Sequence, residues 1–134
     1  MQVQVYLFMD GRAEEAIEFY KKTLGANVTM LMRFKESPDQ SMCVPGSENK
    51  IMHSYLTIGE TGVMISDGRN TGQPKFEGFA LSIATKTAAE ADTLFNALLD
   101  GGKVTMPQTK TFFSARFGML QDKFGVNWMI LVAQ

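Results

Sequence analysis

A long internal repeat is the feature that most constrains the fold of this 134-residue chain. The helical pattern of residues 13–24, followed by Gly-Ala-Asn-Val-Thr-Met, returns in residues 88–99, followed after Asp100 by Gly-Gly-Lys-Val-Thr-Met. The offset is 75 residues through the helical segment and 76 after it, because Asp100 adds one position. Two copies at this spacing fill nearly the whole chain, so we expect two similar modules. Such a fold commonly places its ligand site between the halves.

Each module is predicted to have the element order β-α-β-β-β. In the first module, hydrophobic spacing predicts strands over residues 2–9, 27–34, 50–58 and 62–67, a helix over 13–24 that Gly25 ends, and a loop over 35–49. In the second module it predicts strands over residues 79–84, 103–106, 112–121 and 126–133, and a helix over 87–99 capped by Thr87. The chain is then one domain of two modules, residues 1–67 and 79–134, joined by a Gly-rich linker over 68–78.

Composition excludes several classes of partner. With 13 basic and 14 acidic side chains the net charge is −1, so a nucleic-acid partner is not expected. No apolar run approaches the roughly 20 residues of a membrane span, and the start has no basic targeting region, so we expect a cytoplasmic protein. The single Cys43 has no internal disulfide partner and no adjacent His to activate its thiol, so we do not expect it to be catalytic.

Four segments resemble one known family. They are Tyr6–Tyr20, His53, Met64–Asp67 and Gln121–Ile130, which together span the chain. The chain resembles the vicinal oxygen chelate superfamily of glyoxalase I, the bleomycin resistance proteins and extradiol dioxygenases, and within it the PhnB-like branch, also labelled 3-demethylubiquinone-9 3-methyltransferase-like. The resemblance implies an α+β, glyoxalase-like fold, in which two βαβββ modules with curved mixed sheets enclose a cavity.

The resemblance also implies where a metal would bind. The superfamily holds its metal with side chains near the start of the first strand and the end of the last strand of each module. Offsets within the repeat place Gln4, Ser66, Phe79 and Met129 there. Phe79 has no donor atom and a thioether suits only soft metals, so we expect neither a divalent metal nor another cofactor. A Glu common in the closing strand of metal-using members is replaced here by Met129.

Two polar side chains are candidate anchors for a ligand. His53 is the only histidine, and an offset of 63 residues pairs it with Arg116, which lies in the aromatic stretch 112–117. We expect both to contact an anionic or carbonyl ligand. The alternatives are a hydrogen-bonded histidine at a strand surface and an arginine whose stem packs over phenylalanine at the rim.

Other residues complete the predicted site. Those expected to line the cavity are Tyr6, Phe8, His53, Tyr55, Phe79, Arg116 and Trp128. For catalysis the sequence offers only His53, Asp67 and Arg116, and Asp67 before Gly68 is also typical of a turn. Ten Met residues in this length could either fill the core or line an adaptable apolar pocket.

The function expected from these features is binding of a small organic molecule, with anions among the candidates, in the cavity between the modules without the usual divalent metal. Whether there is turnover stays open. One alternative is a metal-dependent lyase, isomerase or dioxygenase that uses Gln4 and His53; another is a sequestering protein of the bleomycin-resistance type. The methyltransferase label is not expected to describe the activity, because Gly-x-Gly-x-x-Gly is absent. Open sheet edges and superfamily precedent predict a homodimer.

Overall fold

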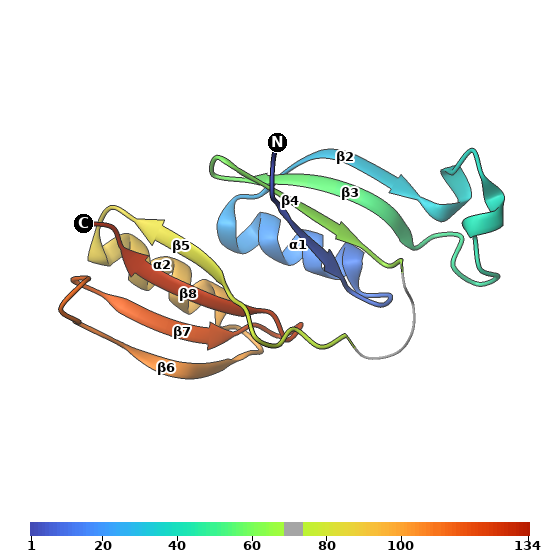
Figure 1. Ribbon diagram of the computed structural model, residues 1–134. Helices are drawn as coiled ribbons and strands as arrows, with labels where there is room; N and C mark the ends of the chain where they lie inside the picture. Colours follow the sequence, from blue (N-terminus) through green and yellow to red (C-terminus); the bar gives the residue numbers. More distant parts are fainter. Residues whose placement is uncertain (69–73) are drawn as a thin grey trace. The chain divides into compact units, whose positions relative to one another are not determined.

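The computed structural model describes residues 1–68 and 74–134. It contains two compact units, Met1–Pro74 and Lys75–Gln134 (Figure 1). Residues 69–73 of the predicted linker lie outside the described residues. Within the part that is described, no helix is long and apolar enough to cross a membrane.

The first unit is a four-stranded mixed sheet with one long helix on one face. Its elements are β1 (Val5–Phe8), α1 (Ala13–Leu24), β2 (Asn27–Arg33), η1 (Phe34–Glu36), η2 (Gln40–Met42), β3 (Ile51–Ile58) and β4 (Thr61–Ser66). The strand order is β1-β4-β3-β2, with β1 parallel to β4 and the other pairs antiparallel. The core lies between α1 and the sheet, where Tyr20 and Ile17 are buried with Leu7, Leu56 and Ile65.

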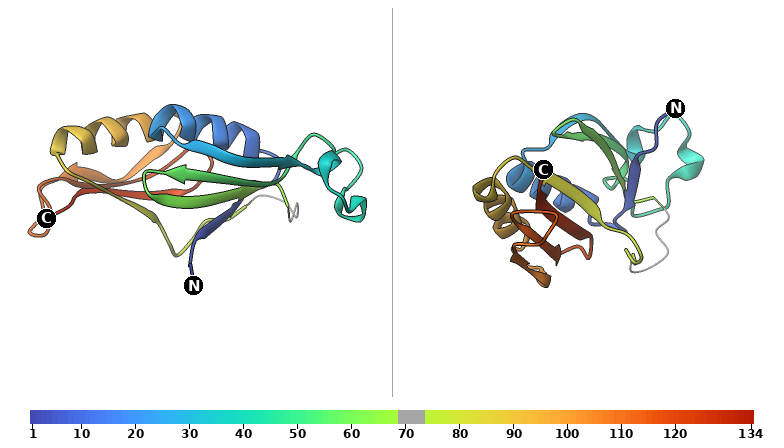
Figure 2. Two further views of the ribbon diagram at one scale, coloured as in Figure 1. Left: turned by 90° about the horizontal axis from the view of Figure 1, so that it is seen from above. Right: turned by 60° about the vertical axis from the view of Figure 1, so that its left-hand side comes forward.

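The second unit repeats this topology. Its elements are β5 (Leu81–Thr85), α2 (Ala88–Leu98), β6 (Lys103–Thr109), β7 (Phe117–Gln121) and β8 (Asn127–Val132), in the order β5-β8-β7-β6. The predicted cap is present, because Thr87 Oγ1 accepts a hydrogen bond from the Glu90 N–H at 3.1 Å. The α+β fold of two βαβββ modules is therefore confirmed, and Figure 2 shows each helix against its own sheet.

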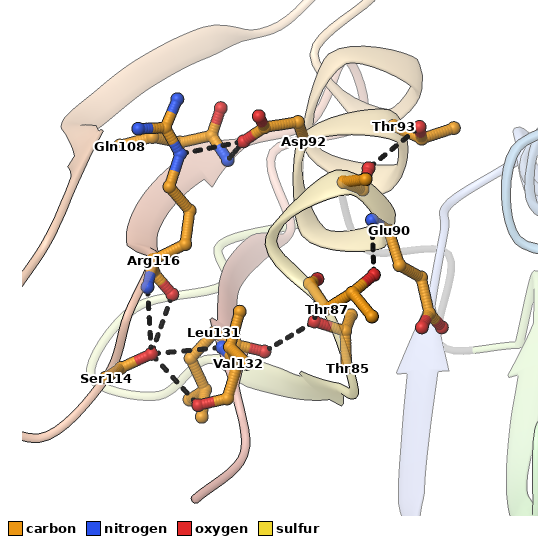
Figure 3. A network of polar contacts seen from close by, with 11 residues as sticks. Thr85, Thr87, Glu90, Asp92, Thr93, Gln108, Ser114, Arg116, Leu131 and Val132 are labelled. Carbon is orange, nitrogen blue, oxygen red and sulfur yellow. Dashed lines mark hydrogen bonds and ion pairs between the residues drawn. The ribbon is translucent and has the colours of Figure 1, made fainter.

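One predicted strand is shorter than expected. The sequence predicts a strand over 112–121, but β7 begins only at Phe117. Ser114 is the reason, because its buried hydroxyl bonds the backbone of Arg116 and Val132 and so ends the hairpin there (Figure 3). The preceding residues turn, with the Thr111 N–H donating to the Ser114 carbonyl at 2.9 Å. Conversely, the strand predicted over 103–106 extends to Thr109.

Each sheet has a face that its helix does not cover, which we call the open face. In the first unit β3 places Leu56 toward α1 and Tyr55 on the open face, since neighbouring strand residues point to opposite sides. In the second unit Gly118 lies on the covered face, because a Cβ there would come within 2.8 Å of the Phe95 ring of α2. Met119 therefore lies on the open face.

A β-bulge at the same place in both modules changes which residues reach the open face. Val28 pairs with Leu56 and Met30 with Tyr55, so one extra residue, Thr29, is inserted in β2. Without that insertion Met30, two positions after Val28, would point toward α1. The bulge recurs at Thr105 in β6, within the same tripeptide Val-Thr-Met.

The buried carboxylate of Asp67 joins three elements of the first unit. One oxygen accepts the backbone N–H groups of Gly11 at 2.7 Å and Ala13 at 2.9 Å, and the other accepts that of Ile51 at 3.0 Å. Asp67 is 4% exposed and so holds the start of α1 and the start of β3 against the end of β4. These contacts give Asp67 a structural role in place of the proton-transfer role considered from the sequence.

Replacing Asp67 with Ala is expected to lower the free energy of unfolding by about 3 kcal/mol, because three N–H groups lose a charged acceptor. Urea denaturation measures this change. Asp100→Ala is the matched control, since that exposed carboxylate makes no side-chain hydrogen bond among the described residues. Equal stabilities for the two variants would contradict the assigned role.

Candidate functional site

The open face of the first sheet brings together four of the residues predicted to bind a ligand. Tyr6 and Phe8 lie on β1, and His53 and Tyr55 lie on β3, all on the side away from α1. Met64 of β4 lies between the two strands, directly opposite both Tyr6 and Tyr55. The pairing of a parallel with an antiparallel neighbour thus assembles the cluster from strands far apart in sequence.

A hydrogen bond and two ring contacts hold the cluster together. The Tyr6 hydroxyl lies 2.8 Å from His53 Nδ1. The Tyr6 ring stacks on His53 with centroids 5.6 Å apart and on Phe8 with centroids 4.8 Å apart. Nearby, the Gln4 amide donates to the Tyr55 hydroxyl at 2.7 Å. The face therefore combines flat apolar surface with a small number of oriented polar groups.

The Tyr6 contact sets what the second nitrogen of His53 can do. When the tyrosine hydroxyl donates to Nδ1, the neutral ring carries its proton on Nε2, which is then a donor. When Nδ1 carries the proton and donates to Tyr6, Nε2 is an acceptor. Among the described residues Nε2 has no hydrogen-bond partner, so it is available to a ligand in either form.

Methionines that the sequence did not single out flank this cluster. Met30 lies opposite Tyr55 and Met32 lies opposite His53, both on the open face. The repeated Val-Thr-Met tripeptide was a visible signal, but its meaning depends on the bulge, which spacing alone does not reveal. The open face of the first sheet is thus lined by aromatic rings and thioethers.

Three other predicted residues lie in the second unit and have different surroundings. Trp128 is 3% exposed, lies on the covered face of β8, and donates its indole N–H to Asp122 at 2.9 Å. Phe79 precedes β5, is 45% exposed, and has its ring centroid 6.5 Å from that of Phe76. Trp128 is therefore a core residue of its unit. A ligand-binding role for Phe79 stays a prediction.

Arg116, the third of these residues, is held by helix α2. Its Nε donates to Asp92 Oδ1 at 2.8 Å, and the Gln108 amide donates to the same oxygen at 2.8 Å (Figure 3). The side chain is 38% exposed. This ion pair places the guanidinium beside α2, and a role in ligand binding stays a prediction.

The strand registers correct the pairing of His53 with Arg116. Tyr55 pairs with Met64 in one hairpin and Met119 pairs with Met129 in the other, so the offset between β3 and β7 is 64 residues. The counterpart of His53 is therefore Phe117. The offset of 63 came from matching the turns, which differ in length, and a slip of one residue reverses the face of a strand.

The same registers test the four expected metal positions. Offsets of 76 from β1 to β5 and 65 from β4 to β8 make Ala80 the counterpart of Gln4 and Leu131 that of Ser66. The Ser66 hydroxyl is buried and already bonds the Met52 carbonyl at 2.6 Å and the Gly68 N–H at 2.7 Å. This set does not fit a hard divalent ion. Among the described residues, no group of three or more His, Cys, Asp or Glu could hold a metal.

Charged groups with altered titration lie off the open face. A hydrogen bond from Arg33 lowers the pKa of Glu14, one from Ser41 lowers that of Asp39, and backbone N–H groups, including that of Gly46, lower that of Glu48. A surface pocket of about 370 Å³ lies at the start of α1, lined by Asp10, Gly11, Arg12, Gly46, Ser47, Lys50 and Asp67. Asp67 is committed there to backbone N–H groups, and Lys50 Nζ donates to the Gly11 carbonyl at 2.9 Å. The open face therefore remains the better candidate.

Comparison with known proteins adds a family to this geometry. The sequence profile of the family described as 3-demethylubiquinone-9 3-methyltransferase matches residues 1–131. Protein YjdN of Escherichia coli K12 is 32% identical over 142 residues, covering 100% of this chain and 97% of that protein.

Solved structures agree with this result. Protein PA1353 from Pseudomonas aeruginosa is 36% identical, with 100% of this chain and 98% of that chain covered and a TM-score of 0.88. A putative 3-demethylubiquinone-9 3-methyltransferase, PhnB protein, from Bacillus cereus is 29% identical, with 99% and 100% covered and a TM-score of 0.84. Proteins of glyoxylase/bleomycin resistance/dioxygenase and fosfomycin resistance type, 12% and 8% identical, share the fold alone. The resemblance inferred from the sequence is confirmed.

The Tyr6–His53 contact can be tested directly, because the chain has one histidine. Tyr6→Phe removes the hydroxyl and keeps the ring, so we expect the ¹⁵N resonance of His53 Nδ1 to move while the melting temperature stays nearly constant. Tyr55→Phe, which removes the bond from Gln4 instead, is expected to leave the resonance in place. An unchanged Nδ1 resonance in Tyr6→Phe would refute the contact.

Proposed function

Since this chain belongs to the 3-demethylubiquinone-9 3-methyltransferase family, the PhnB-like branch of the vicinal oxygen chelate superfamily, we propose that it binds a small organic molecule on the open face of its first sheet. The observation that carries the proposal is the stacked, hydrogen-bonded cluster of Tyr6, Phe8 and His53. Small-molecule sites typically combine apolar and aromatic walls with a few placed polar groups.

The chemistry of the face favours a planar ligand with an anionic or carbonyl group. The rings of Tyr6 and Phe8 offer stacking surface, and the thioethers of Met30 and Met64 adapt to irregular shapes. His53 Nε2 offers a donor when Tyr6 donates to Nδ1. Among its described residues this face carries no carboxylate, so nothing on it would repel an anion.

Binding without the superfamily's divalent metal follows from the donor set. The side chains at the four expected positions and at their register counterparts offer an amide, a committed hydroxyl, apolar groups and a thioether. This supports binding over the metal-dependent lyase, isomerase or dioxygenase reactions that the superfamily also contains. Sequestration of the bleomycin-resistance type is compatible with the same face, and turnover is not part of the proposal.

Methyl transfer is not carried over from the family's description. A Rossmann-like methyltransferase binds its cofactor with a Gly-rich loop after the first strand of a parallel sheet. The sequence lacks Gly-x-Gly-x-x-Gly, and each described sheet is mixed with only one parallel pair. The chain's own residues therefore support binding and do not support methyl transfer.

We also propose that the protein is a homodimer. The edge strands β2 and β6 are largely exposed along their length, and exposed edges are commonly covered by a partner. Light scattering coupled to gel filtration is expected to give twice the chain mass of 14.9 kDa. A monomer mass at every concentration tested would remove this proposal.

Binding is tested with 1-anilinonaphthalene-8-sulfonate, an aromatic anion whose fluorescence rises in apolar sites. We expect His53→Gln and Tyr6→Ala each to weaken binding of this probe by about tenfold, since each removes part of the cluster, a loss worth about 1.4 kcal/mol. Arg116→Ala is the comparison, because that guanidinium is paired with Asp92. The proposal fails if Arg116→Ala weakens binding and the other two variants do not.

A further inference from the structure

Three methionines form a continuous row across the second sheet. Met106 of β6 lies directly opposite Met119 of β7, and Met119 lies directly opposite Met129 of β8. Since Met119 is on the open face, cross-strand pairing puts all three side chains on that face. Met106 is 37% exposed and the other two are partly exposed, so none is sealed in the core.

The bulge at Thr105 is what completes this row. Val104 pairs with Leu120 on the covered face, and regular alternation would send Met106 to the same side. The extra residue turns Met106 to the open face and sets it opposite Met119. A backbone irregularity therefore aligns the third thioether with the other two.

The spacing allows the three sulfur atoms to reach one point. Adjacent strands lie about 4.8 Å apart, and directly opposed Cβ atoms lie about 5 Å apart. Methionine has three rotatable bonds, so the outer two side chains can lean toward a position above Met119. Three neutral thioethers around one point form a soft donor set.

The surroundings of the row exclude harder metals. Its open-face neighbours along β7 and β8 are Phe117, Gln121, Asn127 and Leu131. The amide nitrogens of Gln121 and Asn127 donate to the carbonyls of Gly125 and Phe76, at 3.3 and 2.6 Å. None of these neighbours is a carboxylate, the ligand that Ca²⁺ and Mg²⁺ prefer.

We propose that Met106, Met119 and Met129 together form a binding site for a soft monovalent cation of the Cu(I) class. Thioether sulfur selects such ions over divalent oxygen-seeking metals. The site is separate from the ligand-binding function proposed for the first sheet and involves no residue of that sheet.

The first module supplies an internal control. The corresponding row there is Tyr6, Met64, Tyr55 and Met30, in which Tyr55 separates the two methionines. Met64 and Met129 hold equivalent positions, but only Met129 has a thioether on the adjacent strand. Substitution of Met64 therefore tests whether an open-face methionine suffices without the row.

The experiment uses Ag(I), a redox-stable analogue of Cu(I), in chloride-free buffer. The full chain carries Cys43→Ser throughout, because a thiol would bind the probe, and ¹³C-methyl labels on its ten methionines. We expect the methyl resonances of Met106, Met119 and Met129 to shift together and to saturate at one equivalent. Zn²⁺ at the same concentration is expected to leave them in place.

Single variants then locate the site. Met119→Leu keeps the volume and is expected to weaken Ag(I) binding by about tenfold or more, whereas Met64→Leu is expected to change it little. The proposal is overturned if excess Ag(I) shifts none of the three methyl groups, or if Met119→Leu and Met64→Leu have equal effects. The methyl shifts of the chain with its methionines intact decide the question even if a variant folds poorly.

Discussion

The carboxylate of Asp67 connects the helix of the first unit to its sheet. Two of its acceptor contacts go to the turn and first residue of α1, and the third goes to the first residue of β3. A buried charge is stable only when hydrogen bonds replace water, and here backbone N–H groups do so. The position of α1 determines which sheet face is covered, so the open face and its aromatic cluster depend on this carboxylate.

In the second unit a different arrangement serves the corresponding need. Val132 stands where Asp67 stands in the first, and Ser114 and Thr85 bond the backbone near the end of β8 (Figure 3). Asp122 instead stabilises the β7–β8 turn, accepting the N–H groups of Phe124 and Val126 and the indole of Trp128. The shared topology is therefore secured by side chains at different places, which explains why the modules match in pattern better than in residue identity.

The repeat in the sequence predicted both helices, all eight strands and the βαβββ order, since hydrophobic spacing and glycine stops are local signals. It placed Tyr6, Phe8, His53 and Tyr55 where the structure groups them. It failed for Arg116, because loop lengths between repeats differ and one residue reverses the face of a strand. The hydroxyl of Ser114, which shortens the strand predicted over 112–121, acts through contacts with β8 that no local pattern contains.

The paired bulges at Thr29 and Thr105 separate the evolution of the two sheet faces. Each bulge gives the edge strand a side chain on the open face without disturbing the residue before it on the covered face. Across the corresponding rows Met30 and Met64 match Met106 and Met129, while Tyr6 and Tyr55 correspond to Ser82 and Met119. Two copies of one ancestral module could thus acquire an aromatic surface and a sulfur-rich surface while the packing beneath each helix stayed suitable for folding.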